Sequence, residues 1–570
     1  MTANAQSFSY RMQRLQRSWL RVVATVLLAC CATAGAAQQT AAIASAHPLA
    51  SAAGYDTLKR GGNAFDAAIA IAAVLAVVEP YSSGLGGGGF FLLHRADDGR
   101  QVMVDARETA PLGATRDHYF DRDGNPVSSA STRGGTAAAI PGLPAALVHL
   151  ARHYGRQPLG DTLAAAIRHA RDGFEVDQRF ARIAGLRERF LQSGINTANT
   201  FLDGNRAPQP GFVLRQPALA VTLTRLARDG RSGFYAGPVA RSLVEAANAA
   251  GGAWHVADLD LYKVMEREPV KFTYRGATIT AAALPSAGGI ALAQSLGMLG
   301  QFRLSSAAQA DTAHLVIEVL RRAFQDRVLL GDGDFVAVPA GKLVAKDYAR
   351  QRAATINPDR ATKSDDLQGE KVARAESGNT THFSVIDADG NRVAATLSIN
   401  GLFGAGIVAG DTGVLLNNEM DDFTLHPDVP NSYRLRGGIA NAIAPGKRPL
   451  SSMTPTFVED DKGVLILGAP GGSRIISQVL LVVLDYLRSP TVDLQQLVAM
   501  PRYHHQYWPD RVEIEPEGFN QEWRAALAAK GHEIHVVNRK WGNMQAVFRS
   551  KQTGEAQAAS DPRGADVAWY

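Results

Sequence analysis

Cysteine is almost absent from this chain. Its two cysteines, Cys30 and Cys31, lie in an N-terminal segment that we interpret as a leader, so the mature protein has no disulfide and no thiol nucleophile. The sequence also lacks an HExxH motif, the Cys/His spacing of a zinc site, and the lysine of a phosphate-binding loop after "GAPGGS". His504 and His505 are adjacent, so in a strand they would point to opposite faces, and "GDGD" at 331–334 lacks the other ligands of a calcium loop. We therefore expect no metal and no organic cofactor.

Long hydrophobic runs are missing after residue 40, so we expect no membrane-spanning helix. In the first 37 residues, an apolar run of about a dozen residues, "VVATVLLACCATA", follows four arginines and precedes small residues at 35–37. This arrangement predicts a secretory signal peptide over residues 1–37 and a periplasmic or secreted protein. "LLAC" loosely resembles a lipid-attachment box, so lipid anchoring at Cys30 is an alternative.

The mature chain also lacks an excess of charge of either sign. The four leader arginines account for most of the formal net charge of +5 over 570 residues. Without them, 55 of the 59 basic residues remain, against 54 acidic residues. The basic sequence pI therefore gives no reason to expect binding to nucleic acid. A composition of 46% hydrophobic and 20% charged residues is typical of a folded globular protein, and the length suggests two to four domains.

Helical periodicity dominates the first two-thirds of the chain. A helical pattern over Ala46–Val78 is broken by "GGN" at 61–63, and from about Thr136 to Leu330 only "VKFTYRGATITAAAL" alternates like a strand pair. In between, glycines 84, 86 and 89 match the GxGxxG dinucleotide fingerprint, but a helix precedes them and a strand follows, which reverses the required context. We expect a tight loop through the core there. The charged, polar stretch that ends the large segment, about 345–379, predicts an exposed linker.

Strand patterns follow this linker. "THFSVID" and "NRVAATLSI" flank Ala388-Asp389-Gly390, which is hairpin turn chemistry. Further strand-like runs are "AGIVAG", "TGVLLNN" and "GVLILGA", before a glycine-rich corner, "GAPGGSR", and the helix "IISQVLLVVLDYL". "HEIHVVN" and "NMQAVFRS" suggest another strand pair near the C-terminus. The switch at residue 380 predicts one α+β unit assembled from both halves.

Two adjacent threonines, Thr380 and Thr381, begin the first of these strands. A strand edge with a capping hydroxyl would explain them. The alternative is a hidden nucleophile, because a threonine at a chain N-terminus gains its own α-amine, with a pKa of about 8, as a general base. The Thr380 hydroxyl could attack the carbonyl carbon of Asn379 and form an ester that water opens, which would create that N-terminus.

The chain resembles the γ-glutamyltransferases, which belong to the N-terminal nucleophile hydrolases, along nearly all of its mature length. The matching segments, in order, are "HPLAS", "GGNAFDAA", "VVEPYSSGLGGGGF", "DARETAP", "AAIPGLPAAL", "LPSAGGI", "TTHFSVIDADGN", "GIVAGDTGVLLNNEMDDF", "KRPLSSMTPT", "GAPGGSRII", "PRYHHQYWPD" and "ASDPR". The resemblance implies a four-layer αββα sandwich built from two chains of one precursor. These would be a large subunit, residues 38–379, and a small catalytic subunit, residues 380–570.

The resemblance also implies roles for individual residues. Thr380 would be the nucleophile after cleavage of the Asn379–Thr380 bond, and Ser398 stands where the family usually has a second threonine. Gly471 and Gly472 would form an oxyanion hole with their backbone N–H groups. The substrate residues are implied in two groups: Arg107, Ser451 and Ser452 for an α-carboxylate, and Asn400, Glu419 and Asp422 for an α-ammonium. Tyr433 would belong to a lid loop over 424–438.

Together these features predict a secreted, self-cleaving γ-glutamyltransferase. Its donors would be glutathione and related γ-glutamyl compounds, and its acceptors water, amino acids or dipeptides. Two alternatives remain: a glutaryl or cephalosporin acylase on the same scaffold, and a catalytically silent secreted binding protein.

Overall fold

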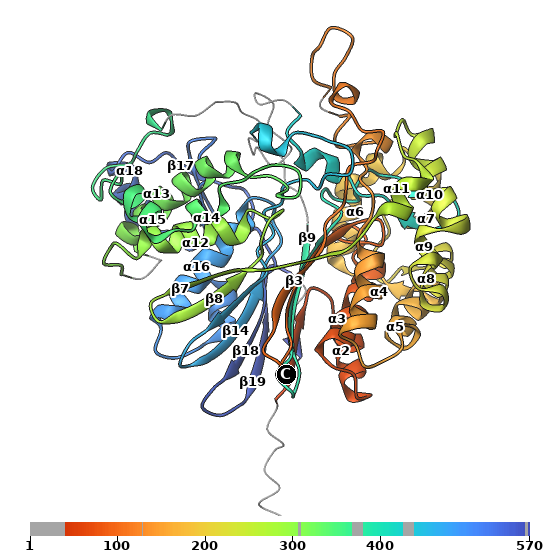
Figure 1. The fold of residues 1–570 in the computed structure, drawn as a ribbon, viewed down its shortest axis with the longest axis horizontal. Coiled ribbons are helices and arrows are strands. Elements are labelled where there is room, and N and C mark those ends of the chain that lie inside the picture. Colours follow the sequence, from red (N-terminus) through yellow and green to blue (C-terminus); the bar gives the residue numbers. More distant parts are fainter. Residues whose placement is uncertain are drawn as a thin grey trace, which may run out of the picture.

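The computed structural model describes residues 40–127, 129–305, 309–367, 380–425, 438–564 and 568–569. Two antiparallel sheets pack face to face in the middle of the molecule, and helices cover the outer face of each sheet (Figure 1). The molecule therefore has four layers in the order helix, sheet, sheet, helix. The predicted αββα sandwich is confirmed.

Both sheets mix strands from the two sides of residue 380. The first sheet has seven strands, in the order β20 (Ala568–Trp569), β1 (Ala42–Ser45), β9 (Thr380–Ile386), β10 (Arg392–Ser398), β2 (Gly88–His94), β3 (Gln101–Ala106) and β6 (Met265–Arg267). The second has six, in the order β19 (Ala556–Ser560), β18 (Gln545–Ser550), β14 (Gly463–Gly468), β13 (Thr456–Glu459), β8 (Ala277–Ala281) and β7 (Val270–Tyr274). A cut before Thr380 would thus leave two chains that share both sheets.

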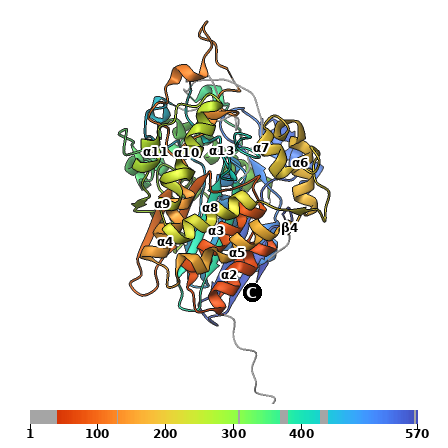
Figure 2. The same ribbon diagram turned by 90° about the vertical axis from the view of Figure 1, so that its right-hand side faces the viewer.

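The helices form two outer layers. Those on the side of the first sheet, which face the viewer in Figure 2, are α2 (Pro48–Lys59), α3 (Ala64–Val78), α4 (Leu143–His153), α5 (Leu159–Asp172), α6 (Gln178–Leu191), α7 (Ile195–Phe201), α8 (Pro217–Asp229), α9 (Ser232–Tyr235), α10 (Gly237–Ala249) and α11 (Val256–Leu261). Those on the side of the second sheet are α12 (Gly288–Leu299), α13 (Ala310–Asp326), α14 (Ala340–Leu343), α15 (Lys346–Ala353), α16 (Arg474–Arg488), α17 (Leu494–Ala499) and α18 (Gln521–Ala529). No helix among the described residues is long and apolar enough to cross a membrane.

Helix α3 shows how sequence fixes this layering. Asn63 caps its first turn, accepting from the N–H groups of Phe65 and Asp66, while the Asp66 carboxylate accepts from the Asn63 N–H. Every residue of α3 is buried, because the helix lies between the first sheet and the helices α2 and α5. An apolar surface all around a helix requires such a position. The predicted break at "GGN" is confirmed.

The glycine-rich loop between α3 and β2 passes through the core, as predicted. A Cβ on Gly86 would lie 2.0 Å from the Leu415 carbonyl oxygen, and one on Gly87 would lie 2.1 Å from that of Ser398. Only glycine permits this approach of three backbone segments. The loop therefore packs directly against the ends of β10 and β12 (Val414–Leu415).

Three sequence expectations differ from the structure. "HEIHVVN" and "NMQAVFRS" do not pair, because β17 (Ile534–Val536) joins a small sheet with β15 (Tyr503–His504) and β16 (Val512–Ile514), whereas β18 joins the second large sheet. The first part of the expected linker is helix α15, whose Ala349 and Ala353 are buried against α12. "AGIVAG" and "TGVLLNN" form only two-residue strands, β11 (Val408–Ala409) and β12.

A further two-stranded sheet is formed by β4 (Phe174–Glu175) and β5 (Val213–Leu214).

Candidate active site

Thr380 and Ser398 lie side by side at one end of the first sheet. Thr380 begins β9 and is paired with Ser398, the last residue of β10, which in turn is paired with Gly88 of β2. Directly opposed residues in an antiparallel pair have Cβ atoms about 5 Å apart, so the two hydroxyl groups are neighbours. The Ser398 hydroxyl oxygen also accepts a hydrogen bond of 2.8 Å from the N–H of Asn400. Both residues are buried.

The imidazole of His382 lies on the same face of β9 as Thr380, two residues along. It is hydrogen-bonded to the hydroxyl groups of Thr396 (2.8 Å) and Ser384 (3.1 Å), deep between the two sheets. Burial lowers the pKa of His382 to about 3, so the ring is neutral. Its nitrogens are thus occupied within the sandwich, and the general base for Thr380 must come from elsewhere. An α-amine on Thr380 itself would supply it.

The second threonine has a different partner. Thr381 points to the opposite face of β9, where its hydroxyl donates to the buried carboxylate of Glu79 over 2.9 Å. Tyr81 donates to the other oxygen of Glu79 over 3.2 Å. Burial raises the pKa of Glu79, against the opposing charge of Arg179. The two threonines therefore point to opposite faces of β9. Thr381 is hydrogen-bonded to the helical layer, and Thr380 faces the space between the two sheets.

A buried ion cluster occupies the same end of the sheet. Arg107 directly follows β3, three strands from Thr380, which corresponds to about 14 Å between backbones. Its Nη1 donates to Glu419, and its Nη2 donates to Asp422 over 2.5 Å. Arg107 is fully buried, while Asp422 retains a 12% exposed side chain. The cluster can thus be reached from the side of Asp422.

Arg107 and the two acids pair with one another in the structure. The sequence resemblance gave them to opposite ends of one zwitterion, an α-carboxylate for Arg107 and an α-ammonium for Glu419 and Asp422. The two arrangements are compatible, because a zwitterion that entered between Arg107 and the two acids would replace these ion pairs. Its carboxylate would pair with Arg107, and its ammonium group would pair with Glu419 and Asp422. The roles of these residues remain predictions.

Two further ionisable groups of the cluster were missed by the sequence analysis. Glu108 is fully buried, and neither of its carboxylate oxygens has a hydrogen-bond partner among the described residues. Burial and the neighbouring Glu419 raise the pKa of Glu108 well above its usual value. Arg327 lies nearby, and burial lowers its pKa to about 10. The position of Glu108 next to Arg107 in "DARETAP" was a usable signal, whereas nothing in the sequence around Arg327 marks it.

The acid–base state of the cluster follows from this crowding. Burial raises the pKa of Glu419 to about 7, although Arg107 opposes the shift. A further cation beside Glu419, such as the ammonium group of a ligand, would favour the charged form of this carboxylate. The cluster is therefore suited to bind a group that carries a positive charge.

Three further residues were predicted to bind the substrate: Ser451, Ser452 and Asn400. The Ser452 hydroxyl is buried without a hydrogen-bond partner among the described residues, as expected of a group that awaits a ligand. Ser451, by contrast, accepts from the Met453 N–H over 3.1 Å. Asn400 has a φ of +66° and donates to the Asn418 carbonyl over 2.8 Å.

Gly471 and Gly472 lie between β14 and α16. Their φ angles are +131° and +58°, and a Cβ on Gly471 would lie 2.9 Å from Gln478. The end of β14 is next to the Thr380 strand, since a Cβ on Gly468 would lie 2.3 Å from the His382 ring. The two glycines thus follow a strand that packs against β9, and they precede the N-terminus of α16, where N–H groups favour negative charge. Their oxyanion role remains a prediction.

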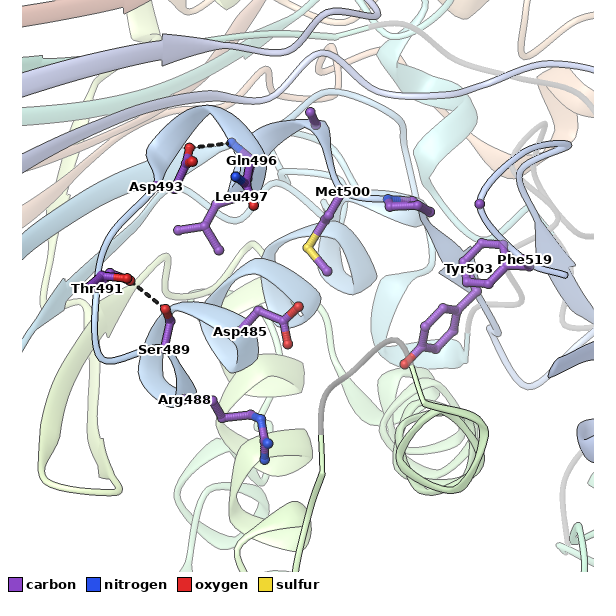
Figure 3. Close-up of a pocket in the computed structure, with 13 residues that line it drawn as sticks. Asp485, Arg488, Ser489, Thr491, Asp493, Gln496, Leu497, Met500, Tyr503 and Phe519 are labelled. Carbon is purple, nitrogen blue, oxygen red and sulfur yellow. Dashed lines mark hydrogen bonds between the residues drawn. The ribbon is translucent and has the colours of Figure 1, made fainter.

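Two predicted positions, Tyr433 and Asn379, lie outside the described residues. A cavity of about 650 Å³ lies elsewhere, between the end of α16, α17 and β15 (Figure 3). Its lining is mixed, with apolar side chains such as Leu497 and Phe519 beside charged ones such as Asp485 and Arg488, and it includes no predicted site residue. Among the described residues, no group of three or more His, Cys, Asp or Glu side chains is arranged to hold a metal ion.

Ser398 provides a direct test of the hydroxyl pair. Ser398→Ala should lower kcat about ten- to a hundred-fold, because it removes the only side-chain group that register places beside Thr380 on β10. Ser398→Thr should stay close to wild type, since it keeps the hydroxyl. The measurement is kcat on γ-glutamyl-p-nitroanilide for fully processed protein. Equal rates for both variants would show that the position contributes no catalytic hydrogen bond.

Comparison with known proteins agrees with the resemblance seen in the sequence. The family model described as gamma-glutamyltranspeptidase matches residues 50–570. The "Glutathione hydrolase proenzyme" of Escherichia coli (strain K12) is 40% identical over 529 residues, which is 92% of this chain and 90% of that protein.

Solved structures show the same fold. The cephalosporin acylase from Bacillus halodurans superposes with a TM-score of 0.82 at 27% identity, over 94% of this chain and 96% of that one. The γ-glutamyltranspeptidase of Helicobacter pylori gives a TM-score of 0.54 at 37% identity, over 55% of this chain and 91% of that one. The chain therefore belongs to the γ-glutamyltranspeptidase family, has the N-terminal nucleophile hydrolase fold, and is an enzyme with hydrolase or transferase activity.

Proposed function

We propose that this protein is a secreted γ-glutamyltransferase that cuts itself between Asn379 and Thr380. The observation that carries the proposal is the strand register, which places Thr380 beside Ser398 at the same end of the sheet as the cluster of Arg107, Glu419 and Asp422. One small substrate could reach both. The predicted signal peptide supports export, and the products would be residues 38–379 and 380–570 held together by the shared sheets.

The reaction follows from these positions. The α-amine of Thr380 takes the proton of its own hydroxyl, whose oxygen attacks the γ-carbonyl carbon of the donor. The backbone N–H groups of Gly471 and Gly472 stabilise the oxyanion, and the amine proton then passes to the departing nitrogen. A γ-glutamyl ester remains on Thr380. Water releases glutamate from it, or the amino group of an acceptor forms a new γ-glutamyl amide.

Glutathione is the donor that the E. coli relative's name favours. The cephalosporin acylase neighbour keeps the acylase alternative in view. An acyl group without an α-ammonium would leave Glu419 and Asp422 with no ligand charge to bind, which favours γ-glutamyl donors. A silent binding protein would have no reason to expose Thr380 as an N-terminus.

The proposal is tested on purified full-length protein. We expect two bands on a denaturing gel, with Thr380 as the N-terminal residue of the smaller chain. We also expect release of p-nitroaniline from γ-glutamyl-p-nitroanilide, faster when glycylglycine is added as an acceptor. Release from glutaryl-p-nitroanilide alone would establish the acylase instead, and an uncut, inactive protein would support the binding protein.

A further inference from the structure

A small basic pocket opens beside Gly471. It has a volume of about 140 Å³ and lies between α6, the start of α16, the segment 539–542 and the C-terminal region. The charged side chains that line it are all basic: Arg179, Arg182, Arg474, Arg539, Lys540 and Arg563. Leu402, Pro470 and Trp541 complete much of the wall. The pocket thus offers hydrogen-bond donors and positive charge, and no carboxylate.

Two buried donors of this lining have no hydrogen-bond acceptor among the described residues. They are Nη1 of Arg179 and Nε1 of Trp541. The nearest carboxylate oxygen to that Arg179 nitrogen, on Glu79, is 3.8 Å away. The guanidinium of Arg474 lies 5.5 Å from the centre of the Trp541 ring, which fixes the two side chains together. Buried donors without partners are costly, so they indicate a site for an acceptor.

The acids behind the pocket do not balance its charge. Glu513 is shared by Arg474 (2.5 Å) and Arg511 (2.8 Å). Arg563 pairs with Glu515 (2.6 Å) and with Asp561 (2.9 Å), and Asp561 also pairs with Arg502. Lys540 pairs with Glu517 (2.7 Å). The shared Glu513 and the exposed Arg182, which has no ion-pair partner among the described residues, leave a net positive charge at the pocket. Such a site attracts an anion more strongly than paired surface arginines do.

The pocket lies next to the predicted oxyanion hole. Gly471, a predicted oxyanion-hole residue, also lines the pocket, so the pocket begins next to the place of the scissile carbonyl. The α-carboxylate of a γ-glutamyl group would be bound at Arg107, on the acyl side. The pocket is therefore left for the group on the leaving side of the scissile bond. Two extended residues span about 7 Å, which is the reach from that carbonyl to the end of a departing dipeptide.

We propose that this pocket binds the C-terminal carboxylate of the leaving dipeptide and, equally, the carboxylate of an amino-acid or peptide acceptor. The inference rests on the proposed γ-glutamyltransferase function. Acceptor and leaving group occupy one site because attack by an amine on the γ-glutamyl ester is the reverse of its departure. The pocket would thus select γ-glutamyl peptides and peptide acceptors with a free carboxylate.

Matched amides test the proposal. Wild-type protein should cleave glutathione about five- to twenty-fold more efficiently, in kcat/KM, than the glycinamide form of glutathione, which lacks the carboxylate. Arg182→Gln and Lys540→Gln, alone and combined, should reduce this preference, mainly through KM for glutathione. Glycylglycine and glycylglycinamide, compared as acceptors with γ-glutamyl-p-nitroanilide as donor, should show the same change and thereby test the acceptor role separately.

Arg241→Gln is the matched control, since Arg241 is an exposed arginine of α10 outside the pocket, and it should keep the wild-type preference. No preference in the wild type, an unchanged preference in the double variant, or an equal loss on both donors would overturn the proposal. γ-Glutamyl-p-nitroanilide has no carboxylate on its leaving side. If the wild type does not cleave it, the proposed function fails; if it does but shows no preference, only the pocket assignment fails.

Discussion

Thr380→Ala is expected to yield a single uncut chain without activity. The same hydroxyl would open the Asn379–Thr380 bond and attack the donor, so its loss stops both steps. Removing a nucleophile costs on the order of 10⁴- to 10⁶-fold in kcat. The fold should survive, because the methyl group of alanine fits the buried start of β9 and the strand keeps its pairing with β10. A denaturing gel, N-terminal sequencing and γ-glutamyl-p-nitroanilide turnover measure the outcome.

The neighbouring threonine is the control for this experiment. Thr381→Val removes the hydrogen bond to Glu79 but leaves the nucleophile, so processing should continue. Thr380→Ser keeps a hydroxyl and should also process. If Thr380→Ala is still cut at the same bond, cleavage does not depend on this side chain and the proposed mechanism is wrong.

The sequence predicted best where structure depends on neighbours along the chain. The hairpin of β9 and β10 follows from period-two alternation around an Asp-Gly turn, and its antiparallel register then brings Thr380 to Ser398. The break between α2 and α3 was predicted from "GGN" at 61–63, and Asn63 caps α3 in the structure. Such signals act within a few residues, so they can be recognised without knowledge of the fold.

Prediction failed where the partner is distant in sequence. "HEIHVVN" and "NMQAVFRS" carry similar strand patterns, but β17 pairs in parallel with β16, while β18 pairs with β14. Helix α15 is rich in charge and suggests a linker, yet two buried alanines on one face pack it against α12. Propensity cannot choose among partners that only the complete fold brings together.

In the candidate site, too, some residues could be predicted from the sequence and others could not. Family resemblance indicated Arg107, Glu419 and Asp422, and the structure shows that their side chains contact one another. Arg327 carries no local signal, because its importance arises from burial beside Asp422 and Arg107, which are 95 and 220 positions away in the sequence. Burial of an isolated polar residue is a property of tertiary packing and cannot be derived from its neighbours in sequence.

Asp422→Ala should separate γ-glutamyl from glutaryl donors. If Asp422 binds the α-ammonium of the donor in its largely buried position, the variant leaves that charge unpaired. Truncating one partner of such a pair costs about 2–5 kcal/mol, or roughly thirty- to several-thousand-fold in kcat/KM. A glutaryl donor keeps the terminal carboxylate but has no ammonium. Its rate should barely fall, or should rise, because Arg107 loses a competing carboxylate.

The measurement is kcat/KM for γ-glutamyl- and glutaryl-p-nitroanilide with wild-type and variant enzyme. Processing must be checked on a gel first, since an uncut variant reports nothing about donor binding. Asp421→Asn is the matched control: the Asp421 carboxylate accepts from the Ser131 hydroxyl over 2.8 Å, so its loss should not change the ratio between the donors. A matching loss on both donors in Asp422→Ala would contradict the ammonium assignment. The acylase would then become the better account of the site, because only the carboxylate of the acyl group would be recognised.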